Sequence, residues 1–212
     1  MANAVSSFPT SIDVLNSAYD PDCGPAIMAM ETYFGGYTGP AALTNVTMQT
    51  FPDELGTSTI QPASGTVELY LCNLRQGMVI NNISLLTHSQ AGVTPTHQWA
   101  GISSYVAGGN GKCLATSADG LTAAIGADSV ISFALSAPYT VPTSGLYYLF
   151  YCIAAGTVPT IVAAPTLSGH GRGNIAPIPA GPGDTGKTTP YTVGATVTAP
   201  TAAAAATLLY CN

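Results

Sequence analysis

The segment Gly181–Thr188 has the sequence GPGDTGKT, which matches the G-x-x-x-x-G-K-[ST] pattern of phosphate-binding loops. Such a loop needs a buried strand before it and a helix after it, because the amides at the helix N-terminus hold the phosphates. Prolines oppose both elements, and they stand at Pro177, Pro179, Pro182 and Pro190. We therefore interpret the segment as a Gly/Pro-rich loop without a preceding strand, and we expect no nucleotide cofactor.

Three histidines are the candidates for a general base, at His88, His97 and His170. A serine hydrolase would also need a nucleophile such as that of a Gly-x-Ser-x-Gly turn, which the sequence lacks. We expect the unclustered histidines to be structural, with His97 capping a strand next to Trp99. Asp20 and Asp22, on either side of a proline, indicate a turn more than a calcium site. The sequence therefore predicts no enzyme, no metal and no cofactor.

The five cysteines lie far apart and include no Cys-x-x-Cys pair. A structural zinc site needs such local pairs, so the spacing argues against zinc. Cys72, Cys152 and Cys211 lie within strongly apolar runs, where a free cysteine acts as a small hydrophobic side chain. We expect unpaired thiols at Cys23, Cys72, Cys113, Cys152 and Cys211.

Charged side chains make up only 7% of the chain, against about 25% in average soluble domains. Four basic and ten acidic residues give a net charge of -6. Nucleic-acid binding needs clustered Lys and Arg, so the composition argues against that function. Hydrophobic residues reach 47%, which argues against disorder. A surface with so few charges predicts that the protein packs against its own copies or against other proteins.

Membrane and export signals are also missing from the sequence. No stretch of about 18 apolar residues occurs, so we expect no membrane insertion. The first residues, MANAVSS, have neither the basic nor the apolar region of a signal peptide. We therefore expect the protein to be made in the cytoplasm.

From about residue 66 the sequence becomes a series of short β-rich runs separated by turn residues. The runs cover residues 67–74, 78–88, 98–106, 112–117, 130–136, 146–154, 159–163, 188–198 and 206–211. With no convincing helix between them, they predict an all-β fold, a jelly-roll-like antiparallel β-sandwich over residues 66–212. Residues 146–153 are apolar on both faces, which is typical of a central strand that is covered on both sides.

Residues 1–65 differ in their poor apolar periodicity and their frequent Pro and Gly. They contain one helical pattern at 24–34, which has Pro25 at its start and Gly35 after its end. A helix of about three turns is too short to stand alone, so it must dock on another surface. We therefore predict an N-terminal arm whose assembly interface consists of Ile27, Met30, Tyr33 and Phe34.

Three sequence phrases occur in order: Trp99–Ile102 (WAGI), Leu114–Asp119 (LATSAD) and Pro138–Tyr148 (PYTVPTSGLYY). Together they resemble β-sandwich proteins encoded by tailed bacteriophages of actinobacteria, which are described as minor tail proteins or other virion structural proteins. The resemblance implies a component of the virion exterior, whose partners are major capsid or tail proteins and, in a homo-oligomer, copies of itself. It supplies no catalytic residues. The compact length of the chain also allows a head-decoration role.

An alternative is a host-surface glycan-binding module of the phage tail. Jelly rolls also form lectin domains, and eleven tyrosines and one tryptophan could stack on sugars. Packing in a core or an interface is the commoner role for aromatic residues in strand patterns, namely Tyr70, Tyr105, Tyr147, Tyr148 and Tyr151. The sequence leaves both hypotheses open.

Overall fold

The computed structural model describes residues 48–49, 58–165, 180–201, 205–207 and 209–211. All of them belong to one compact unit, Asn45–Asn212. The helix predicted at 24–34 lies outside the described residues. So do the residues assigned to the arm interface, the possible calcium ligands, one cysteine and one histidine, namely Ile27, Met30, Tyr33, Phe34, Asp20, Asp22, Cys23 and His170.

The described residues form strands, turns and loops, and no helix occurs among them. The strands are β1 (Met48–Gln49), β2 (Ser58–Ile60), β3 (Thr66–Leu74), β4 (Val79–Leu86), β5 (Val93–Ser104), β6 (Gly111–Thr116), β7 (Val130–Thr140), β8 (Gly145–Thr157), β9 (Ile161–Pro165), β10 (Ala180–Pro182), β11 (Thr196–Val197), β12 (Ala205–Thr207) and β13 (Leu209–Cys211). They pair antiparallel throughout. The predicted all-β class is confirmed.

The strand pairing is nested around the hairpin of β5 and β6. β5 pairs with β6, β4 with β7, β3 with β8, and β2 with β9. A long antiparallel hairpin that rolls up on itself produces this order, which is the topology of a jelly roll. β8 also pairs with β5, so the larger sheet has the order β10-β3-β8-β5-β6-β11.

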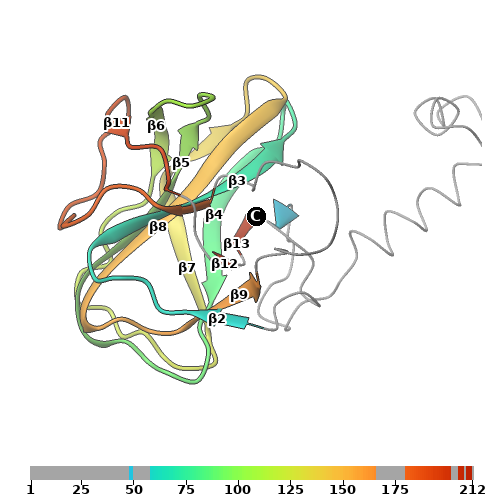
Figure 1. The fold of residues 1–212 in the computed structure, drawn as a ribbon. Coiled ribbons are helices and arrows are strands. Elements are labelled where there is room, and N and C mark those ends of the chain that lie inside the picture. The colour runs from blue at the N-terminus through green and yellow to red at the C-terminus, as the bar shows by residue number, and fades with distance from the viewer. Residues whose placement is uncertain (1–47, 50–57, 166–179, 202–204, 208, 212) are drawn as a thin grey trace, which may run out of the picture. The chain divides into compact units, whose positions relative to one another are not determined.

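Two smaller sheets, β1-β13-β4-β7 and β12-β9-β2, form the second layer of the sandwich. A bridge between Thr87 and Ile161 connects the end of β4 to the start of β9. Inward side chains of both layers form one main core, to which the smaller sheets contribute Ile83, Phe133 and Ile161. In Figure 1, β8 of the larger sheet crosses β4 and β7 of the second layer.

β8 lies in the interior of the larger sheet, between β3 and β5. Its odd-numbered residues 147–153 face the main core, and its even-numbered residues 148–152 face a second apolar cluster on the outside of the sheet. This alternation follows from the period of two along a strand. The prediction of a central strand that is covered on both sides is confirmed.

The outer cluster is covered by the segment that follows β10. Tyr191 and Val197 of this segment are buried in the cluster with Phe150 of β8. The rings of Tyr191 and Phe150 meet edge to face, with their centroids 5.5 Å apart. This geometry is favourable for aromatic pairs, so the segment is held to the sheet by packing rather than by a long run of strand pairing.

Two elements of this C-terminal region differ from the prediction. Of residues 188–198, only Thr196–Val197 forms a strand, because Pro190 lacks a ladder donor and Gly194 turns the chain with a φ of 87°. Ala180–Pro182 forms a strand where prolines predicted none. It lies at the edge of the sheet, where a proline without an N–H is tolerated.

A tyrosine corner fixes the connection between β7 and β8. The hydroxyl of Tyr147 donates a hydrogen bond of 2.8 Å to the backbone oxygen of Thr143, four residues earlier. Such corners are a feature of β-sandwiches with Greek-key connections. The corner lies within the phrase Pro138–Tyr148, so this phrase has a folding role in the chain.

Candidate binding site at the open end of the sandwich

The connection between β6 and β7 (residues 117–129) is tied to β5 by Asp119. Oδ1 of Asp119 accepts hydrogen bonds from the amides of Gln98 at 3.0 Å and Leu121 at 2.9 Å. Its Oδ2 accepts one from Nδ1 of His97 at 2.6 Å. His97 thus lies within β5 and is held by a carboxylate, so the predicted capping of a strand end is wrong.

The charged form of Asp119 is favoured in the folded protein. Burial acts to raise the pKa of its carboxyl group, but the hydrogen bonds from His97, Gln98 and Leu121 outweigh burial and hold the pKa below its ordinary value. Stability from this group is therefore present above the ordinary carboxyl pKa. It is lost as the pH falls through the lower pKa of the folded state.

We expect Asp119→Asn to lower the free energy of unfolding by about 2 kcal/mol at neutral pH, because a neutral amide replaces a charged acceptor of several hydrogen bonds. The loss should shrink below the carboxyl pKa, where the wild-type group is also neutral. Urea unfolding at about pH 7 and about pH 3 measures both values. The exposed Asp128 of the same connection supplies the control variant Asp128→Asn. An equal loss at both pH values would contradict this account.

Backbone strain is concentrated at this end of the sandwich. Within the described residues, the non-glycine residues with positive φ are Thr94 at 48°, Leu121 at 47° and Asp128 at 45°. This conformation is unfavourable for a β-branched residue such as Thr94, and strain of this kind gathers at binding and switch sites. Val93 and Leu121 also expose more than half of their apolar side chains here. These observations mark the region as the candidate functional site.

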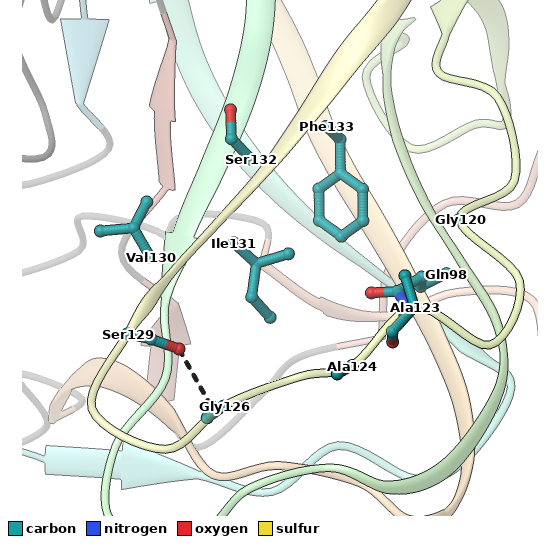
Figure 2. A pocket seen from close by; sticks show the side chains of 10 residues that line it. All are labelled: Gln98, Gly120, Ala123, Ala124, Gly126, Ser129, Val130, Ile131, Ser132 and Phe133. Carbon is teal, nitrogen blue, oxygen red and sulfur yellow. Dashed lines mark hydrogen bonds between the residues drawn. The ribbon is translucent and has the colours of Figure 1, made fainter.

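A hollow of about 270 Å³ opens between the 117–129 connection and the first residues of β7. Figure 2 shows its lining, with Gln98 and Ala123 on one side and Ile131 and Phe133 on the other. None of the described residues that line it carries a charge. The hollow therefore suits a neutral molecule better than an ion.

Gln98 supplies the most directional polar group of the hollow. Its side chain is only 3% exposed, and Nε2 donates a hydrogen bond of 2.7 Å to the backbone oxygen of Ala123. This bond fixes which end of the carboxamide is nitrogen. The oxygen Oε1 points toward the hollow (Figure 2), and it is not a buried atom without a partner, since among the described residues that group consists of Trp99 Nε1. A ligand in the hollow can donate a hydrogen bond to Oε1 in place of water.

β7 contributes an open strand edge to the same hollow. It is the last strand of its sheet, where it pairs with β4 on one side. On its other side, the described residues form one isolated bridge, between Leu135 and Ser117. In an antiparallel edge strand, alternate residues direct their N–H and C=O groups away from the partner strand. The amide of Thr87 donates to the oxygen of Ser129, and the register pairs Leu85 with Ile131, so the odd-numbered residues of β7 bond to β4. The N–H and C=O groups of Val130 and Ser132 therefore lie on the open edge.

The segment that resembles a phosphate-binding loop uses its amides for folding. The amide of Gly183 donates to the oxygen of Val67, and that of Lys187 donates to the oxygen of Gly65, both at 2.8 Å. No helix follows it among the described residues. Residues 183–188 form a loop as interpreted, but the expectation that no strand precedes this loop is wrong, because β10 includes Gly181 and Pro182.

Asp184 of this loop is the centre of a second hydrogen-bond network. Its carboxylate accepts hydrogen bonds from the hydroxyls of Thr198, at 2.5 Å, and Tyr191. Nζ of Lys187 lies 3.8 Å from Oδ2 of Asp184 and 4.9 Å from the centre of the Tyr191 ring. Burial raises the pKa of Tyr191, and its bond to Asp184 raises it further, so the phenol stays neutral. These hydrogen bonds connect the loop at Asp184 to the segment 191–198.

The cysteines of the described part are buried free thiols, as predicted: Cys72, Cys113, Cys152 and Cys211. Burial raises the pKa of Cys72 to about 12 and that of Cys113 to about 11, so these thiols stay protonated. They are therefore poor nucleophiles and poor metal ligands.

Trp99 and the tyrosines noted in strand patterns are buried, with the exception of Tyr105: Tyr70, Trp99, Tyr147, Tyr148 and Tyr151. Tyr105 is half-buried, and its ring packs edge-on against Tyr148 with a centroid distance of 5.5 Å. Core packing therefore explains these residues. The five buried side chains are not available to stack on a sugar.

Among the described residues, no three His, Cys, Asp or Glu side chains gather into a possible metal site. No helix in this part of the chain is long and apolar enough to cross a membrane. No protein-family model and no curated protein matches this chain.

Proposed function

We propose that this chain is a non-enzymatic structural protein on the exterior of a tailed phage particle, as a head decoration or minor capsid protein or as a minor tail protein. The three sequence phrases that carry the resemblance lie in the β-sandwich, and jelly rolls are common in viral capsid domains.

The observation that carries the proposal is the small number of exposed charged side chains among the described residues. Glu68 is buried, and Asp119 and Asp184 are held by internal hydrogen bonds. The described residues thus offer few exposed charges, such as Arg75 and Lys112. Charged residues are depleted at the centres of protein interfaces, because burying them costs solvation free energy. A surface of this kind favours packing against neighbouring subunits over catalysis.

In this proposal the N-terminal arm docks on major capsid or tail proteins through Ile27, Met30, Tyr33 and Phe34. The body then contacts its own copies in a homo-oligomer. Apolar burial provides the affinity, at about 25 cal/mol per Å² before the costs of association. No nucleic acid and no membrane takes part.

Quantitative mass spectrometry of purified phage particles tests the placement. A copy number close to that of the major capsid protein is the expected result for a head decoration. A few copies per particle would place the protein on the tail instead. If the protein is missing from purified particles, the virion proposal is wrong.

We expect deletion of residues 1–44 to abolish incorporation into particles while the body stays folded. This boundary keeps β1 and β2, which pair with β13 and β9. Circular dichroism and thermal unfolding check the fold, and immunoblotting of purified particles checks incorporation. The full-length variant Ile27→Asp with Phe34→Asp tests the apolar interface separately. Normal incorporation of both proteins would remove the arm from the proposal.

The second candidate function is a host-surface glycan-binding module of the phage tail. The observation that favours it is the uncharged hollow beside Gln98, with a buried polar group directed into it. It predicts saturable binding of the full chain to host cells. Loss of that binding on filling the hollow would distinguish this function from a purely structural one.

A further inference from the structure

We propose that the hollow between the 117–129 connection and β7 binds one ring of a neutral saccharide, with Gln98 as its principal hydrogen-bond acceptor. This inference rests on the second candidate function and names the site and the ligand class for it. Trp99 and the buried tyrosines of the strands play no part in this site, because their rings are packed in the core.

The size and charge of the hollow restrict the ligand. Its volume of about 270 Å³ lies just below the usual range for small-molecule sites, so it accommodates one small ring rather than a long molecule. No charged side chain lines it among the described residues. A phosphate, a carboxylate or an ammonium group would lose part of its solvation without gaining an oppositely charged partner among these residues. The ligand is therefore neutral.

The polar groups require a ligand with hydrogen-bond donors. Oε1 of Gln98 is held in place by the bond from Nε2 to Ala123, so its direction is set before a ligand binds. The open edge of β7 adds the backbone donors and acceptors of Val130 and Ser132. Hydroxyl groups can both donate and accept hydrogen bonds. Neighbouring hydroxyls on one ring can therefore bond to Oε1 of Gln98 and to the backbone groups of β7.

The remaining lining is apolar and suits the carbon face of a sugar ring. Ile131 and Phe133 lie on the β7 side, while Ala123 and Ala124 lie on the opposite side. A molecule that combines several hydroxyls with an apolar face matches this combination. Saccharides have both features.

An extended peptide fits less well, although open strand edges often bind peptides. The 117–129 connection runs directly into β7, and Ser129 donates a hydrogen bond of 3.1 Å to the oxygen of Gly126 at the bend. Figure 2 shows this bend at one end of the hollow. A peptide strand that continued along β7 would meet it after a few residues.

The test uses the full chain and a panel of neutral monosaccharides: glucose, galactose, mannose, arabinose, rhamnose and N-acetylglucosamine. Saturation-transfer NMR detects binding, and titration calorimetry measures the Kd. We expect at least one sugar to bind with a Kd on the order of 1–10 mM, because a single ring makes few contacts. Gln98→Leu and Ala124→Phe should each weaken this binding about tenfold or more.

Two variants on the 117–129 connection form a matched pair. Ala124→Phe places a large side chain at the hollow, whereas Ala127→Phe places one at an exposed position that does not line it. Thermal unfolding shows whether each variant is folded. Ala124→Phe also leaves the bond between Gln98 and Ala123 in place, so it reports on occupancy of the hollow even if Gln98→Leu disturbs the loop.

Either of two results with the sugar panel would overturn the inference. One is no binding of any sugar in the panel at tens of millimolar, and the other is binding that Ala124→Phe leaves unchanged. Binding of an unstructured peptide that competes at the hollow, in place of a sugar, would also overturn it.

The copy number in particles is measured independently. A protein that is present in virions but binds no sugar defeats this inference alone, whereas one that binds sugar but is absent from virions defeats the virion proposal alone.

Discussion

As the pH rises from about 4.5 to about 8, the free energy of unfolding of the Glu68→Gln variant is expected to increase by about 3 kcal/mol relative to that of the wild type. Glu68 lies on β3 with its side chain only 3% exposed. The hydroxyl of Tyr70 lies 3.5 Å from its Oε2, which is a long hydrogen bond. Burial raises the pKa of Glu68 from 4.5 to about 7, and the bond from Tyr70 opposes this only in part.

The sign of the effect follows from proton binding. Between pH 4.5 and about 7, the folded state holds a proton on Glu68 that the unfolded state has lost. The stability of the wild-type protein therefore falls as the pH rises through this window, and it levels off above the pKa of the folded state. Glutamine is neutral at every pH, so the variant lacks this loss.

Urea unfolding of wild type and Glu68→Gln at several pH values between about 4.5 and 8 measures the difference. Asp128→Asn is the control, because Asp128 is an exposed carboxylate. Its difference from wild type should stay nearly constant over this range. Parallel curves for wild type and Glu68→Gln would show that the buried carboxyl does not titrate in the window.

Gly101→Ala is expected to lower the free energy of unfolding by about 2–3 kcal/mol, the cost of overpacking a tight core. A Cβ at Gly101 would lie 2.4 Å from the backbone oxygen of Ala115 and 2.4 Å from Cζ of Phe150. Phe150 is fully buried and packs against Tyr191, so its ring has little room to move. The expected sign is opposite to that of strand propensity, which favours alanine over glycine.

Gly145→Ala is the matched control in the neighbouring strand, because a Cβ there would meet nothing within 4 Å. Its effect should stay within about 0.5 kcal/mol, as for most open positions. Chemical unfolding monitored by circular dichroism measures both variants. A loss below about 0.5 kcal/mol for Gly101→Ala would mean that β5 and β6 can move apart without cost.

Most of the strands could be predicted from the sequence, because side-chain alternation and turn residues are local signals. The apolar run at 146–153 also predicted a strand that is covered on both faces. The prediction failed at 188–198, where Tyr191 and Val197 are buried although most of the segment is not a strand. An apolar residue in the sequence indicates that its side chain is buried, but it does not indicate that its backbone pairs in a sheet.

The candidate site could not be predicted in the same way. The phrase WAGI directly follows Gln98, and the phrase LATSAD ends at Asp119. No local pattern shows that these two residues, 21 positions apart, are hydrogen-bonded. The strained residues Thr94 and Leu121 have no signal of their own in the sequence. The aromatic residues, which drew attention to sugar binding, are used for packing instead.

By itself, the sequence determined the all-β class of the described residues, the low charge, the cysteines in apolar runs and the Gly/Pro-rich character of residues 181–188. These properties depend on composition and on the spacing of near neighbours. The tertiary structure alone decided which strands of the predicted jelly-roll-like sandwich pair, that Glu68 is buried, and that Gln98 faces β7 across a hollow. These features depend on contacts between distant segments, because many pairings of the same strands bury similar apolar surface, and only packing in three dimensions selects one of them.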